Sequence, residues 1–185
     1  MFDLNDEKEF GGMPAIFNGG VAGLVENVSI DRIEKNDGDS NQPPYKIFYK
    51  DESGNEINQG WFYFKPYPGA DDESVNKSKR GEVSRIRSFA VAVLGKDATL
   101  PKVESVEEAL DSVMKLTKDG FSGKKFNIYT NYNTKTNPKT YLQLRKYNFI
   151  EPAGTEPTTL TSNPNDLMER LVPEADSTTT DDSWV

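Results

Sequence analysis

Short segments of alternating side chains, separated by polar turns, constrain the fold of this chain more than any other feature. Within each segment apolar or aromatic residues alternate with polar ones, which is typical of half-buried β-strands. Clusters of Gly, Pro, Asn and Asp, such as Lys35–Pro44 and Asp51–Asn55, interrupt the segments and indicate turns. We therefore expect strands over Val21–Glu34, Tyr45–Lys50, Glu56–Lys65, Lys124–Tyr132 and Lys139–Tyr147.

Helical spacing replaces this alternation between the third and the fourth expected strand. Apolar residues recur at helical intervals in Glu82–Leu94, and Gly95 is placed to end that helix. A second helix is expected over Ser105–Lys118, where Ser105 and Glu108 form a capping-box pattern. The order of elements predicts a mainly β protein with a helical insertion (α+β), namely a five-stranded OB-like barrel with helices between strands 3 and 4.

Composition divides the chain into an irregular leader over 1–20, one OB-like domain over 21–150, and a tail over 151–185. The tail is rich in Thr, Pro, Ser and acidic residues, so we expect it to be largely disordered. The acidic start Met1–Phe10 lacks the apolar stretch of a secretory signal, and the chain has no apolar run long enough to span a bilayer. We expect a cytoplasmic protein without a membrane partner.

Two residue types that carry much of enzyme chemistry are missing, because the chain contains neither Cys nor His. Their absence excludes thiolate chemistry, His-assisted nucleophiles and the usual zinc sites. The paired glycines near the start are not followed by the Lys-Ser/Thr of a P-loop. We therefore expect no enzymatic activity, no metal site and no cofactor.

The basic residues are segregated although the chain as a whole is acidic. The formal net charge is -8, which by itself argues against a polyanionic partner. The segment Phe121–Ile150, however, carries Lys and Arg residues interleaved with aromatic ones and contains no acid. This combination suits single-stranded nucleic acid, since cations neutralise phosphates and exposed rings stack on bases.

Strand alternation assigns these rings and cations to one face of the sheet, because residues two apart in a strand share a face. In the third strand, for example, Trp61, Tyr63 and Lys65 lie opposite Phe62 and Phe64. We predict that one outward groove binds DNA through Lys46, Phe48, Trp61, Tyr63, Lys65, Lys125, Tyr129, Tyr141, Arg145 and Tyr147.

Two features of this prediction have structural alternatives. Aromatic residues are also good strand formers, so the rings could serve only the sheet, and the lysines could form a solvated face without a ligand. A further basic cluster either extends the basic track or is the solvent face of the first helix; its members are Lys77, Lys79, Arg80, Arg85 and Arg87.

The last residues combine acidic and hydrophobic side chains. Acidic residues from Glu174 onward are accompanied by no Lys or Arg, and the final stretch contains Asp181, Asp182, Trp184 and Val185. Such a segment can compete with DNA for a basic groove, or its aromatic tip can dock in a pocket of a partner protein. The alternative is an acidic terminus that only improves solubility.

Taken together, these features resemble the single-stranded-DNA-binding proteins of bacteriophages. The stretch Asn18–Phe64 resembles their first three strands, and Asp181, Asp182, Trp184 and Val185 resemble the acidic and hydrophobic end of such proteins. The resemblance implies a protein that coats single strands in DNA replication, recombination or repair with little sequence preference. It also implies a tail that recruits a polymerase, primase or helicase.

Two other functions remain open from the sequence. A phage structural or assembly protein that binds only protein would use an exposed aromatic face as an interface, including one between copies of the chain. A small inhibitor that mimics DNA would use the overall negative charge instead.

Overall fold

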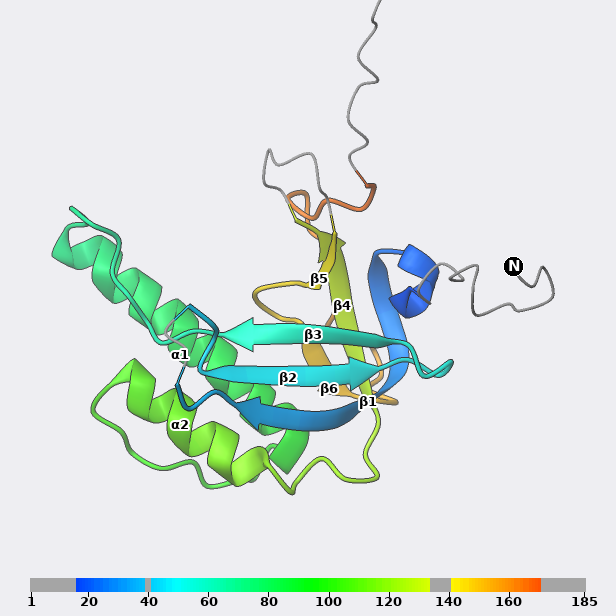
Figure 1. Cartoon of the computed structure of the whole chain (residues 1–185), viewed down its shortest axis with the longest axis horizontal. Helices are drawn as coiled ribbons and strands as arrows, with labels where there is room; N and C mark the ends of the chain where they lie inside the picture. The colour runs from blue at the N-terminus through cyan, green and yellow to red at the C-terminus, as the bar shows by residue number, and fades with distance from the viewer. Residues whose placement is uncertain (1–15, 39–40, 134–140, 171–185) are drawn as a thin grey trace, which may run out of the picture.

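An antiparallel sheet and two helices make up the computed structural model, which describes residues 16–38, 41–133 and 141–170 (Figure 1). A short 3-10 helix, η1 (Phe17–Gly20), precedes the sheet. The strand order along the sheet is β3-β2-β1-β4-β5, and β6 pairs with β4. The elements that follow η1 are β1 (Gly23–Lys35), β2 (Tyr45–Lys50), β3 (Glu56–Trp61), α1 (Asp72–Leu94), α2 (Val106–Thr117), β4 (Phe126–Tyr132), β5 (Leu142–Leu144) and β6 (Ile150–Pro152).

The long strand β1 joins the two halves of the sheet. Its first part pairs with β4 from Gly23 to Val28, and its second part pairs with β2 from Ser29 to Lys35. The register shifts between Val25 and Val28, where Asn27 has a positive φ of 57°. A bulge of this kind bends a strand and increases its twist, so one strand can serve two differently oriented halves.

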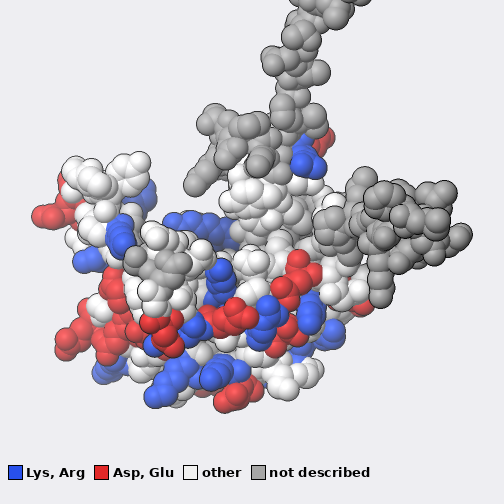
Figure 2. All heavy atoms as spheres, in the orientation of Figure 1, with Lys and Arg blue, Asp and Glu red and all other residues white. Residues whose placement is uncertain are grey.

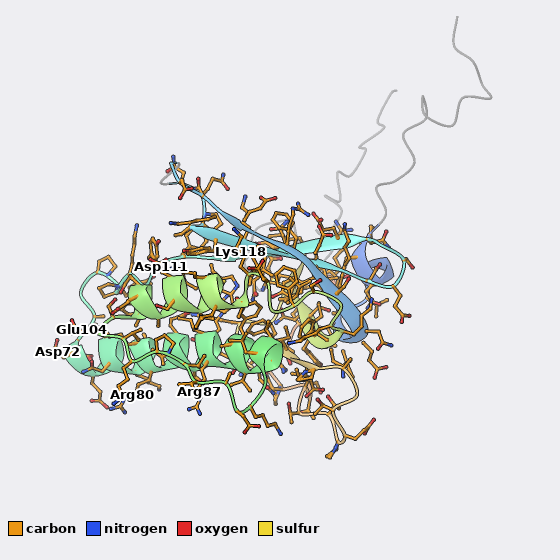
Figure 3. The ribbon with its side chains drawn as sticks, turned by 90° about the horizontal axis from the view of Figure 1, so that it is seen from below. Asp72, Arg80, Arg87, Glu104, Asp111 and Lys118 are labelled. Atoms are coloured by element: carbon orange, nitrogen blue, oxygen red, sulfur yellow. The ribbon has the colours of Figure 1, made fainter. Side chains whose placement is uncertain are left out.

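The helices cover one face of the β1–β2–β3 half (Figures 1 and 3). Asp71 caps the start of α1, where its side chain accepts a hydrogen bond from the Ser74 amide, and Ser105 caps α2 in the same way through the Glu108 amide. The Ser105 half of the predicted capping box is confirmed, whereas the Glu108 carboxylate accepts from the amide of Glu104 instead of that of Ser105. Helix α1 begins ten residues before the expected Glu82, because the polar stretch Asp72–Gly81 is helical although it carries no apolar stripe.

The core lies between this sheet face and the helices. Tyr45, Ile47 and Tyr49 of β2 point inward, and Phe89 of α1 is fully buried opposite them. Burial of these apolar surfaces is the main contribution to stability, at about 25 cal/mol per Å². The outward residues of β2 alternate with the inward ones, as the sequence predicted.

Three expectations about the architecture need correction. The sheet has six strands and its described part is not closed into a barrel, whereas five strands in a closed barrel were expected. The domain also extends beyond 150, because β6 pairs with β4 and the side chain of Leu160 is buried. Likewise, Phe17 of the expected leader belongs to the core. In the described ranges, none of the helices has the length and apolar character needed to cross a bilayer.

Candidate nucleic-acid interface

The ten predicted DNA-binding residues do not form one outward face. Four of them are buried, and one of these, Phe48, is 8% exposed on the outer face of the sheet. The other three, Trp61, Tyr129 and Arg145, have exposed fractions of 1%, 4% and 6%. Their assignment to an outer surface is therefore wrong. Trp61 packs against Phe89 and Phe149 with ring centroids 5.8 Å and 5.9 Å apart, so its ring serves the core.

Alternation identified the two faces of β3 but assigned them the wrong way round. Trp61 and Gln59 point inward, and the strand ends at Trp61. After the strand ends, Phe62 is 62% exposed, whereas Tyr63 is half-buried and its hydroxyl donates to Asp111 over 3.0 Å. The expected order, with Phe62 inside and Tyr63 outside, is reversed.

Arg145 has a structural role. Its guanidinium donates to the carbonyls of Tyr147, Asn148 and Thr161 and forms a 3.0 Å ion pair with Asp166. The same group lies 4.1 Å from the centre of the Tyr129 ring. These bonds use four of the five N–H donors of Arg145, which is 6% exposed, so the side chain ties Thr161 and Asp166 to the sheet and does not face a ligand.

The outer face of β1, β2 and β3 carries paired charges. Lys46 and Phe48 lie on this face as predicted, but Phe48 is only 8% exposed because the Arg32 guanidinium covers its ring at 3.6 Å. Arg32 in turn contacts three carboxylates at 2.7 Å, those of Asp31, Glu34 and Glu56. Figure 2 shows both signs of charge intermixed over this face. A polyanion would have to break these pairs to bind here.

Two further predicted residues, Lys125 and Tyr141, are exposed but stand apart from the others. Lys125 precedes β4, whereas the backbone carbonyl of Tyr141 accepts from the Asn133 amide beyond the opposite end of that strand. Lys135, Lys139 and the tail residues Asp181, Asp182, Trp184 and Val185 lie outside the described residues.

A groove of about 470 Å³ does bring rings and cations together. One wall is the segment Phe62–Tyr67 that follows β3, and the other is the N-terminal half of α1. Lys146 and Tyr147, which follow β5, complete the lining. Of the ten predicted residues, Tyr63, Lys65 and Tyr147 line this groove, which we call the α1 groove.

Three aromatic side chains in the α1 groove are largely open to solvent. Phe62, Tyr67 and Tyr147 are 62%, 85% and 44% exposed. Gly81 allows Tyr147 to lie against α1, because a Cβ at this position would be 3.1 Å from the Tyr147 hydroxyl. Pro66 and Pro68 flank Tyr67 and fix their own backbone φ angles. Exposed rings at this density are uncommon on a surface that has no partner.

The cations of the α1 groove are Lys65, Lys146 and Arg85. Lys65 forms no ion pair with any described residue, whereas Lys146 contacts Glu82 at 2.7 Å. The Arg85 guanidinium lies 3.9 Å from the centre of the Trp61 ring, with its side chain 11% exposed. Among the described residues Arg85 forms one ion pair, to Glu82, which is long at 3.4 Å, and its buried Nε finds no hydrogen-bond partner there. Burial lowers the pKa of Arg85, which indicates an incompletely compensated charge.

The rest of the basic cluster on α1 lies on another side of the helix. Figure 3 shows Arg80 and Arg87 pointing away from the sheet. With Lys79 they line a second hollow of about 780 Å³, which also contains Glu104 and Glu107. This hollow sets two acids against three cations, whereas one acid, Glu82, faces three cations in the α1 groove, so the hollow is less suited to a polyanion. Figure 2 shows basic groups in the space between the projecting part of α1 and the β4–β5 half of the sheet.

Three lining residues, Phe62, Tyr67 and Lys146, were not among the predicted interface residues. Lys146 belongs to the acid-free segment, so its composition was a usable signal. Tyr67 stands between two prolines outside any strand, which disfavours a place in the core of a sheet. In the described ranges, no three acidic side chains gather as ligands for a metal ion.

Comparisons with protein-family models, with curated proteins and with solved structures found no match to this chain.

Proposed function

We propose that the protein binds single-stranded DNA in the α1 groove without sequence preference. The observation that carries the proposal is the convergence of three exposed rings, Phe62, Tyr67 and Tyr147, with the cations Lys65, Lys146 and Arg85. Base stacking on such rings contributes about 1–3 kcal/mol per base, and cations along the groove neutralise the phosphates.

The buried guanidinium of Arg85 supports an anionic ligand in particular. A charged group removed from water without full pairing raises the free energy of the folded protein. A phosphate in the α1 groove would offer acceptors to the terminal nitrogens of Arg85, whose contact with Glu82 is long at 3.4 Å. A single strand suits the groove better than a duplex, because the bases of a duplex are already stacked and cannot lie against the rings.

The strand order supports a relationship to OB-folds. An order of β3-β2-β1-β4-β5, with β3 near β5, is that of a five-stranded OB barrel opened between these two strands. In this family, oligonucleotides bind beside strands 2 and 3 and the neighbouring loops. The α1 groove begins directly after β3, next to that region.

A mobility-shift assay with labelled oligo-dT tests the proposal. The expected result is a shift that weakens steeply as the salt concentration rises. Unlabelled duplex of the same length should compete poorly with the labelled oligo-dT. No shift at low salt, or a preference for duplex, would contradict the proposal and favour an assembly protein that binds only protein.

We also propose that the acidic stretch beyond the described residues recruits replication proteins and competes with DNA for the groove. The charges of Asp181 and Asp182 support this, together with the hydrophobic Trp184 and Val185. Truncation after Leu171 should tighten oligo-dT binding. Unchanged affinity would remove this stretch from the binding mechanism.

A further inference from the structure

Glu82 is the one acidic side chain among the described residues that line the α1 groove. Its Oε1 accepts from Lys146 at 2.7 Å, and its Oε2 faces the Arg85 Nη1 at 3.4 Å. The carboxylate is 18% exposed, so it lies at the wall of the groove and does not extend into solvent. Two of the three cations proposed to hold phosphate thus share one internal anion.

The pairing is asymmetric between the two cations. Lys146 has a short bond to Glu82 and lies 5.1 Å from the centre of the Tyr147 ring, so its charge is well compensated. Within the part of the chain that the structure describes, Arg85 has only the long contact with Glu82, and its buried Nε is unpartnered. A backbone phosphodiester, like a carboxylate, carries one negative charge and two oxygens that can each accept from more than one donor, so it can take the place of the carboxylate between these cations. The Glu82 carboxylate therefore occupies the position between the two cations, but it compensates the charge of Arg85 less well than that of Lys146.

We propose that Glu82 is an internal phosphate substitute, which occupies the site between Arg85 and Lys146 until a strand displaces it. This inference rests on the proposed function. The carboxylate keeps two cations from remaining unpaired in the free protein, and it lowers the affinity for DNA because each binding event must break its contacts. Glu82 thereby sets how readily the protein releases a strand.

Fluorescence anisotropy with labelled oligo-dT can separate this role from a structural one, using Glu82→Gln and the control Glu73→Gln. The control removes the same charge from the same helix, but Glu73 does not line the groove. We expect Glu82→Gln to bind about threefold to tenfold more tightly than the wild type. The control should change affinity by less than about twofold. Thermal unfolding without DNA should show Glu82→Gln to be the less stable of the two, because Arg85 and Lys146 lose their partner.

The combination of lower stability and tighter binding distinguishes the two roles, since a purely structural Glu82 would lower both. A double-mutant cycle adds Lys146→Met. If Glu82 and a phosphate compete for Lys146, the gain from Glu82→Gln should fall by about half or more in that background. Additive effects would overturn the inference. Glu82→Asp, which keeps the charge but withdraws the carboxylate by one methylene, should also tighten binding and serves if the Gln variant does not fold.

The two proposals fail in different ways. If the wild type does not bind oligo-dT at low salt, the proposed function is wrong. If the wild type binds but folded Glu82→Gln binds equally or more weakly, only the role of Glu82 is wrong.

Discussion

Replacing Tyr67 by Ala tests base stacking with little disturbance of the fold. The ring is 85% exposed, so its removal takes almost no apolar surface from the core. The turn around it depends on the backbone, because the Tyr67 carbonyl accepts from the Ala70 amide at 3.0 Å, and Ala keeps that bond. We therefore expect the free energy of unfolding to change by less than about 0.5 kcal/mol, as for other surface substitutions.

The expected effect on DNA binding is much larger. Loss of one stacking surface costs about 1–3 kcal/mol, which weakens binding about 5-fold to 150-fold. Anisotropy titrations with oligo-dT measure the affinity, and thermal unfolding measures stability in the same samples. Tyr141→Ala is the matched control, because Tyr141 is 56% exposed but does not line the α1 groove. Unchanged affinity of Tyr67→Ala, or an equal loss with Tyr141→Ala, would refute the stacking argument.

Three other substitutions test separate parts of the structure. Arg145→Met should lower the free energy of unfolding in urea by about 3–5 kcal/mol, because it leaves Asp166 buried without its cation; a loss under about 1 kcal/mol would show that the pair is not structural. Gly81→Ala should weaken oligo-dT binding without lowering the melting temperature, because the new Cβ crowds the Tyr147 ring while Ala favours the helix; unchanged binding would show that the ring need not rest on α1. Burial acts to raise the pKa of Glu151, but bonds from Thr158, Thr159 and Asn127 outweigh it and hold the pKa below the ordinary 4.5. The stability that Glu151 contributes is therefore complete above pH 4.5 and is lost as the pH falls through the lower folded-state pKa. The free energy of unfolding, measured at several acidic pH values, should depend less on pH for Glu151→Gln than for the wild type. An identical pH dependence would contradict this cause.

Local sequence signals predicted the elements well where each segment carries its own pattern. The alternation in Tyr45–Lys50 and the turn after it correspond to β2 and the β2–β3 hairpin. The caps of α2 follow from Ser105 and Glu108, whose side chains act within one turn. The first ten residues of α1 have no apolar stripe, so periodicity alone did not reveal them.

The candidate site was less predictable, because its residues depend on contacts distant in sequence. Alternation of residues separates the two faces of a strand but does not say which face meets the helices. For this reason the prediction placed Trp61 outside and Phe62 inside, the reverse of their positions in the structure. Arg145 resembled a surface cation, and only its contacts with Thr161 and Asp166 reveal its burial. The acid-free composition of Phe121–Ile150 indicated a basic segment but not which of its cations share a groove with Phe62 and Tyr67.

Photo-crosslinking tests most directly where a single strand lies on the protein. Oligonucleotides carrying 5-iodouracil react with nearby aromatic side chains on irradiation, and mass spectrometry identifies the peptides that are modified. The account predicts adducts at Phe62, Tyr67 and Tyr147, all of which line the α1 groove. Adducts confined to Phe48 on the outer face of the sheet, or to Tyr141, would contradict it.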